Sequence, residues 1–165
     1  MHADFGKKDN LADKTTLLFA VYGVDPQPMA KTNPWYKYYT FLPKEESVDD
    51  GNLVQVGGKP IRGCLACYKC FENKDGRCAV KADGLNDVMA KMFEADALIL
   101  GSPTYFTDVT AELKALIDRA GLVAIANGGL LAGKIGAGVV AVRRGGATHV
   151  FDTINHLFQI SRMII

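Results

Sequence analysis

The sequence has almost no net charge, which excludes several classes of partner. Its 165 residues contain 19 Lys and Arg against 18 Asp and Glu, a net charge of +1. Such a balance leaves no excess of positive charge to attract nucleic acid or an anionic membrane, so we expect small-molecule partners. An uninterrupted membrane-spanning run is also lacking. The most apolar stretch, residues 121–142, contains Lys134 and repeated glycines, which predicts a loop and a buried strand instead of a bilayer helix.

Other functional signals are missing as well. The opening MHADFGKKDN has no charged region leading into an apolar one, so we expect a cytoplasmic protein with reduced cysteines. Histidine is scarce, and His2, His149 and His156 show no metal-ligand spacing. Residues 128–134 match G-x-x-x-x-G-K, but Ile135 stands where a magnesium-binding Ser or Thr is required, which excludes a nucleotide P-loop.

Cysteine is rare but concentrated, because all four lie within the 15 residues from Cys64 to Cys78. Cys64, Cys67 and Cys70 recur at every third residue, so their sulfurs can converge on one site that Cys78 closes. This compact spacing is typical of iron–sulfur ligation and favours a cluster. Zinc is an alternative, since C-x-x-C is also a zinc spacing and four thiolates make a closed tetrahedral site. Free or redox-active thiols are a third interpretation.

Apolar patterns alternate between strand and helix from residue 53 onward. Residues 53–56, 97–100 and 135–142 are short apolar runs, whereas residues 85–93, 110–120 and 148–158 carry apolar positions at helical spacing. Residues 16–22 are a candidate first strand. Repeated strand–helix units predict a parallel sheet with right-handed crossovers, a doubly wound α/β domain. We expect a single domain, 1–165, with a divergent amino-terminal segment, 1–52.

Helix boundaries can also be expected from single residues. Asp83 and Thr148 are candidate N-caps for the first and third helices, and Gly121 is a candidate stop for the second.

Ligands of doubly wound sheets bind outside the carboxyl ends of the strands, and two loops meet that condition. Both offer features suited to a flat cofactor: hydroxyls and aromatic rings in the first, and glycines that admit close backbone approach in the second. The first loop carries Ser102, Pro103, Thr104, Tyr105 and Phe106, and the second carries Arg144, Gly145, Gly146 and Ala147. Tyr105 and Phe106 could instead cover the following helix. Arg143 and Arg144 could bind a nucleotide phosphate or form a solvated pair.

Three segments together resemble the NADPH-dependent FMN reductase family, especially its iron–sulfur flavoprotein branch. They are GCLACYKCFENKDGRC, ALILGSPTYFTDVTAELKALIDRAG and GKIGAGVVAVRRGGATHVFDTINHLF, in that order, and the resemblance covers residues 53–165. It implies a flavodoxin-like fold, FMN at the loops 102–106 and 144–147, and a [4Fe–4S] cluster on Cys64, Cys67, Cys70 and Cys78. It also implies a homodimer or homotetramer, with the flavin site completed across a subunit interface.

The activity implied by this resemblance is a flavin-dependent oxidoreductase. NAD(P)H or a protein donor would reduce FMN, and electrons would pass singly through the cluster to an acceptor, with no side chain as acid or base. Two alternatives belong to other classes: a non-catalytic module with a structural zinc and an empty flavin pocket, and a thiol redox sensor.

The sequence departs from the family pattern at both ends. Residues 23–28 hold Asp25 and two prolines where the family has a glycine- and serine-rich phosphate loop, and these residues would repel a phosphate or remove amide donors. The sequence stops at Ile165, where the pattern requires another strand and helix. We therefore expect a sheet incomplete in its first βα unit and at its last strand, with an exposed edge.

Overall fold

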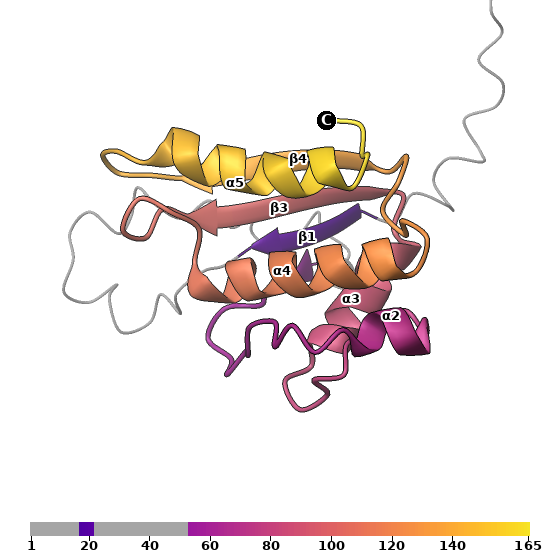
Figure 1. Cartoon of the computed structure of the whole chain (residues 1–165). Coiled ribbons are helices and arrows are strands. Elements are labelled where there is room, and N and C mark those ends of the chain that lie inside the picture. Colours follow the sequence, from indigo (N-terminus) through magenta and orange to yellow (C-terminus); the bar gives the residue numbers. More distant parts are fainter. Residues whose placement is uncertain (1–16, 22–52) are drawn as a thin grey trace, which may run out of the picture.

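The sheet of the protein is parallel and has the strand order β2-β1-β3-β4. The computed structural model describes residues 17–21 and 53–165. Its strands are β1 (Leu17–Val21), β2 (Leu53–Val54), β3 (Ala97–Pro103) and β4 (Ile135–Ala141) (Figure 1). The order 2-1-3-4 is that of flavodoxin-like doubly wound sheets, so the predicted fold class is confirmed. The candidate first strand is found as β1, in the middle of the sheet. The predicted absence of a phosphate loop, at residues 23–28, lies outside the described residues.

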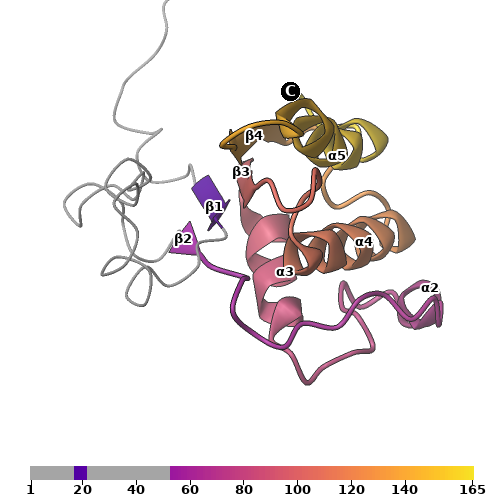
Figure 2. The same ribbon diagram turned by 90° about the vertical axis from the view of Figure 1, so that its left-hand side faces the viewer.

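The longer helices cover one face of this sheet. They are α3 (Leu85–Glu94), α4 (Ala111–Ala126) and α5 (Ala147–Ile160), while the short α2 (Lys69–Asn73) lies against α4, away from the sheet (Figure 2). None of the helices in the described ranges is long and apolar enough to cross a membrane. Residues 121–126, expected to form a loop, extend α4, and only the later part of that apolar stretch is a turn followed by β4.

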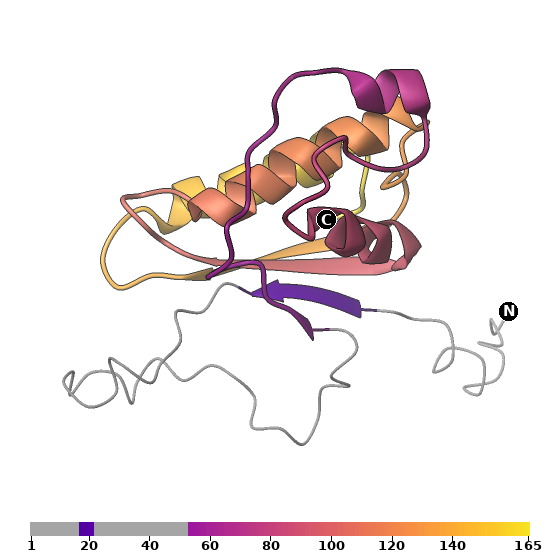
Figure 3. The same cartoon turned by 90° about the horizontal axis from the view of Figure 1, so that it is seen from below.

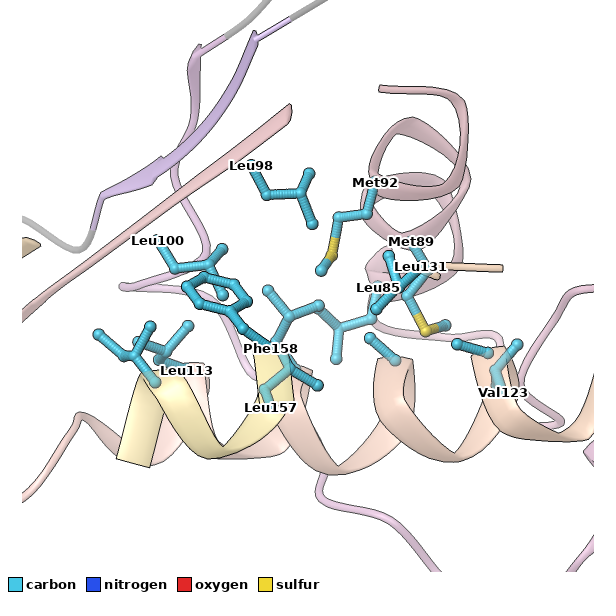
Figure 4. Packing of buried hydrophobic residues seen from close by; sticks show 14 of the residues in the cluster. Leu85, Met89, Met92, Leu98, Leu100, Leu113, Val123, Leu131, Leu157 and Phe158 are labelled. Carbon is cyan, nitrogen blue, oxygen red and sulfur yellow. The ribbon is translucent and has the colours of Figure 1, made fainter. Parts of the chain in front are cut away.

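The core lies between the helices and the sheet. Side chains with periodic spacing on α3, α4 and α5 meet those of β3, as the sequence predicts, including Met89, Met92, Leu98, Leu100, Leu113, Leu157 and Phe158 (Figure 4). The Phe158 ring lies on Gly136 of β4 so closely that a β-carbon there would come within 2.8 Å of it. On the other face of β4, Ile135 and Val139 are more than half exposed, so this strand is not buried on both faces as its apolar run suggested.

The expected helix boundaries are only partly correct. Gly121 does not end α4, because it lies where α4 crosses α5: a β-carbon on it would come 3.3 Å from Leu157. The glycine is thus used for close packing. The N-cap of α5 is Gly146, in a left-handed conformation, two residues before the predicted Thr148. The N-cap of α3 is Gly84, although the neighbouring Asp83 accepts a bond of 3.3 Å from the Leu85 amide.

The outer edge of β4 pairs at one point with Ile164. Ile164 forms a parallel bridge with Ile135, in which the Gly136 amide donates to the Ile164 carbonyl at 2.7 Å and the Ile164 amide donates to the Lys134 carbonyl at 2.9 Å. The edge that the sequence predicts to be exposed is therefore paired at its amino end, while no fifth strand forms within residues 53–165.

Candidate functional site

The two strand-end loops leave the same edge of the sheet. Pro103 at the end of β3 pairs with Ala141 at the end of β4, and the Thr104 amide donates to the Ala141 carbonyl at 2.9 Å. Because the strands are parallel and in register, the chain turns away from both at one level. The structure thus brings the two predicted flavin loops together.

Gly146 and the first loop are in direct contact. A β-carbon on Gly146 would lie 2.7 Å from the Thr107 Cα and 2.9 Å from the Thr104 methyl, and Gly146 has a φ of 94°. Beside this contact, the Thr104 hydroxyl is buried and has no hydrogen-bond partner within the described residues. An unpaired buried hydroxyl is costly, so Thr104 offers a hydrogen bond to a ligand at this junction.

The aromatic residues of the first loop differ in their surroundings. Tyr105 and Asp108 exchange backbone hydrogen bonds of 2.9 and 3.1 Å, which closes a tight turn. At its tip, Phe106 has a φ of 47° and Thr107 a φ of 72°, both unusual for residues with side chains. The Phe106 ring is fully exposed, so it does not cover the following helix. Backbone strain of this kind clusters at ligand sites, and here it places an aromatic ring in solvent at the loop tip.

Other predicted loop residues have structural contacts or lie in solvent. The Ser102 hydroxyl is buried, donates to the Pro103 carbonyl at 2.8 Å and accepts from the Thr110 amide at 3.2 Å. Ser102 therefore fixes the start of α4. Arg144 and Gly145 are exposed, and Ala147 is half-buried at the start of α5.

Asp108 connects the first loop to α5, a role that sequence reasoning missed. Its carboxylate accepts from the Val109 amide at 2.7 Å and the Thr153 hydroxyl at 3.1 Å, and lies 3.4 Å from His149 Nε2. Partial burial would raise the pKa of Asp108, but these hydrogen bonds and the imidazole lower it overall. The carboxylate thus stays charged and ties the first loop to α5.

The four cysteines line one pocket beside α4. Cys64 and Cys67 are exposed, Cys78 is half-buried and Cys70 is buried; the other lining residues include Val80, Arg119, Leu122 and Val123. Within the described ranges, no three His, Cys, Asp or Glu side chains are arranged to hold a single metal ion. The donor set of four thiols around one hollow nevertheless suits a cluster, which spreads its ligands over several irons, better than a single zinc with all sulfurs at about 2.3 Å.

The backbone around the cysteines contains three residues in a strained conformation. Ala66, Tyr68 and Lys74 have φ values of 49°, 53° and 49°, in the left-handed region that most residues avoid. The Ala66 amide points at the Cys64 sulfur at 3.4 Å. Strain of this kind persists where the surroundings fix it, and it is common at ligand sites.

Cys70 and Cys78 differ in their surroundings. Burial raises the pKa of the Cys70 thiol, and the nearby Cys78 and Cys64 add to the rise although backbone hydrogen bonds oppose it. The side chain of Asn86, on α3, holds the backbone of Cys78 in place. Its amide oxygen accepts a hydrogen bond from the Cys78 amide at 2.7 Å, and its amide nitrogen donates to the Cys78 and Val80 carbonyls at 3.0 Å each. A bound cation would oppose the rise in the pKa of Cys70 by stabilising its thiolate.

The two sites lie at different points along α4. Thr110 caps the helix next to the strand-end loops. The short α2, which carries Cys70, lies beside the other end of α4 (Figures 1 and 3), and Arg119 in the middle of α4 lines the cysteine pocket together with Val123. At a rise of about 1.5 Å per residue, Thr110 and Arg119 are about 14 Å apart along the axis. In sequence, the cysteines precede the loop that follows β3, with α3 and β3 between them.

Comparisons with known proteins agree on the family. A family model described as NADPH-dependent FMN reductase matches residues 43–165. An iron–sulfur flavoprotein of Methanocaldococcus jannaschii is 33% identical over 142 residues, or 85% of this chain and 70% of that protein. A second iron–sulfur flavoprotein of that organism is 29% identical, over 87% of this chain and 73% of the relative.

A solved structure adds evidence on the fold alone. The flavodoxin, WrbA-like protein from Agrobacterium tumefaciens superposes with a TM-score of 0.52 at 15% identity, over 91% of this chain and 76% of that one. The family match covers β2, the cysteine pocket and both strand-end loops. The chain therefore belongs to the NADPH-dependent FMN reductase family.

Proposed function

We propose that this flavoprotein oxidoreductase binds FMN at the two strand-end loops and a [4Fe–4S] cluster at Cys64, Cys67, Cys70 and Cys78. The observation that carries the proposal is the single pocket lined by all four cysteines, in a chain whose curated relatives are named iron–sulfur flavoproteins. NAD(P)H or a protein donor would supply electrons, and a second partner would accept them.

The residues at the sheet edge are suited to holding a flavin. Thr104 has an unused buried hydroxyl, Gly146 leaves the junction without a side chain, and Phe106 presents a free ring. Tyr105 and Arg144 flank this junction from the two loops. When bound, FMN would supply two-electron chemistry and the cluster one-electron storage, while the protein positions both. The chain's own task is then to bind, orient and exclude water, and none of its side chains is required as an acid or a base.

An assembly of subunits forms part of the proposal. Several large apolar side chains of β4, α5 and the last residues are exposed: Ile135, Val139, Phe151, Ile160 and Ile164. Together with the exposed Phe106, they support a homodimer or homotetramer, because large exposed apolar side chains often mark a surface that a partner covers. Light scattering on the purified protein measures this directly.

Cofactor analysis after anaerobic purification tests the proposed function. We expect flavin absorption bands, about four iron and four sulfide per chain, and bleaching of the flavin on addition of NADPH or NADH. A Cys70→Ser variant should lose iron and keep FMN, whereas a Phe106→Ala variant should keep iron and bind FMN more weakly. A colourless protein with one zinc per chain would replace the proposal with a structural zinc module. Metal-free protein with thiols that oxidise reversibly would point to a redox sensor.

A further inference from the structure

Arg119 is a buried charge in the middle of α4. Its side chain is fully shielded from solvent, and it is the bulkiest of the fully buried residues in the described part of the chain. Burying a guanidinium is unfavourable unless its charge and its N–H groups find partners. Asp83, also buried, supplies the opposite charge through an ion pair with Nη1.

The remaining bonds of Arg119 tie down both ends of the cysteine segment. Nη1 donates to the Arg62 carbonyl at 3.1 Å, and Nη2 donates to the Val80 carbonyl at 2.8 Å. Arg62 lies two residues before the first cysteine, and Val80 lies two residues after the last. Asp83 strengthens this arrangement by accepting from the Arg62 amide at 3.1 Å. One guanidinium thus fixes to α4 the two points between which all four cysteines lie.

Arg119 also borders the cysteine pocket. Nε is buried and makes no hydrogen bond to any described residue, while Arg119 lines the same pocket as the four cysteines. An arginine side chain stays protonated in proteins, so the guanidinium is a positive charge beside the pocket.

We propose that Arg119 is a positioning residue for the iron–sulfur site: it fixes the cysteine segment and holds a permanent positive charge against the pocket, which raises the reduction potential of the cluster. This inference depends on the proposed function, since it requires the cysteines to hold a cluster. Reduction adds one electron, and no proton, to a cluster that four thiolates already make anionic. A buried cation stabilises the more negative, reduced form, because charges interact strongly where water is excluded.

A purely structural role for Arg119 would give a different result. An arginine that only holds the segment in place would affect folding and cluster retention, but not the potential of the cluster that remains. The potential measured by a dithionite titration, followed by electron paramagnetic resonance on anaerobically purified protein, separates the two roles.

The test compares Arg119→Gln and Arg119→Lys with Arg77→Gln as the matched control. Arg77 is next to Cys78 in sequence, but its side chain is half exposed and paired with Asp87 at 3.5 Å, so its charge is screened by water. We expect Arg119→Gln to shift the potential to more negative values, Arg119→Lys to shift it less, and Arg77→Gln to leave it near that of the wild type. An Arg119→Gln protein with full iron content and an unchanged potential would overturn the inference.

Asp83→Asn provides a second test if the Arg119 variants do not fold. It removes the compensating negative charge and leaves the guanidinium in place, so the potential should move in the opposite direction, to more positive values. An unchanged or more negative potential in Asp83→Asn would also overturn the inference. Wild-type protein without iron and sulfide would contradict the proposed function itself, which is a separate result.

Discussion

Gly146 and Thr107 touch through their backbones: a β-carbon on Gly146 would come 2.7 Å from the Thr107 Cα. The two residues belong to loops that follow different strands, β4 and β3. Their contact, together with the φ of 94° at Gly146, means that only glycine fits there without strain. The two candidate flavin loops thus form one packed junction.

A Gly146→Ala substitution should disrupt this junction. We expect a loss of about 1–3 kcal/mol in the free energy of unfolding, because the methyl group overlaps Thr107 backbone and the φ is unfavourable for alanine. FMN binding should weaken about tenfold, equivalent to about 1.4 kcal/mol. Urea unfolding and fluorescence titration with FMN measure the two effects.

The neighbouring glycine is the matched control. Gly145 has no atom within 4 Å of its added β-carbon and no positive φ, so Gly145→Ala should fold as well as the wild type. Equal behaviour of the two variants would show that the loops are not packed together in solution.

Phe106→Ala separates ligand binding from folding. The ring is fully exposed, so its removal should change the free energy of unfolding of the apoprotein by less than about 0.5 kcal/mol. FMN affinity should nevertheless fall several-fold, because an aromatic ring at the loop tip can stack on a flat cofactor. Phe158→Ala is the contrasting control: this buried ring supports the core, and its removal should cost about 3–5 kcal/mol. Unchanged FMN affinity in Phe106→Ala would remove Phe106 from the candidate site.

Much of the fold from residue 53 onward could be predicted from apolar periodicity. The run at β3 and the helical spacing of Met89, Leu116 and Phe158 predict buried residues correctly. The run at β4 does not, because that strand is exposed on one face. Helix ends were less predictable. A glycine such as Gly121 can end a helix, or it can lie inside one and let a neighbouring helix pack closely. The structure uses it for contact with Leu157, which a local pattern does not reveal.

The candidate site was predicted only where its residues are adjacent in sequence. The cysteine cluster and the two loops are local motifs, whereas Arg119 and Asp83 are 36 residues apart and meet only in the folded protein. A signal did exist for Arg119: it lies three residues after Leu116 and four before Val123, on an apolar helix face. A charge at such a position needs a buried partner, but the sequence does not say which one.

The ion pair between Asp83 and Arg119 predicts a pH-dependent stability. Burial would raise the pKa of Asp83, but hydrogen bonds from Arg119, Arg62 and Leu85 lower it overall. A carboxylate with a lowered folded-state pKa stabilises the fold above its unfolded pKa, and this stabilisation is lost as the pH falls through the folded value. Asp83→Asn should therefore cost about 3 kcal/mol at pH 7, since it leaves Arg119 buried without its counter-charge.

Urea unfolding at a series of pH values measures this effect. The difference between wild type and Asp83→Asn should shrink as the pH falls, because the wild-type carboxylate then becomes protonated. Asp87→Asn is the control: its side chain is 82% exposed and 3.5 Å from Arg77, so its removal should cost less than about 1 kcal/mol at any pH. A pH-independent difference for Asp83→Asn would mean that the pair contributes through packing and not through charge.

The cysteines of metal-stripped protein should react with iodoacetamide in a fixed order. Cys64 and Cys67 are exposed and should be alkylated first, whereas Cys70 is 7% exposed and burial raises its pKa, so little of it is thiolate at pH 7. Raising the pH should accelerate Cys70 strongly, because a thiol with a raised pKa is mostly protonated near pH 7. Peptide mapping by mass spectrometry gives the four alkylation rates. In urea the protein is unfolded, so the four rates should become similar. Reaction of Cys70 as fast as Cys64 in the folded protein would contradict its burial. In protein that carries iron, all four rates should fall together, since alkylation requires the thiolates that the metal occupies.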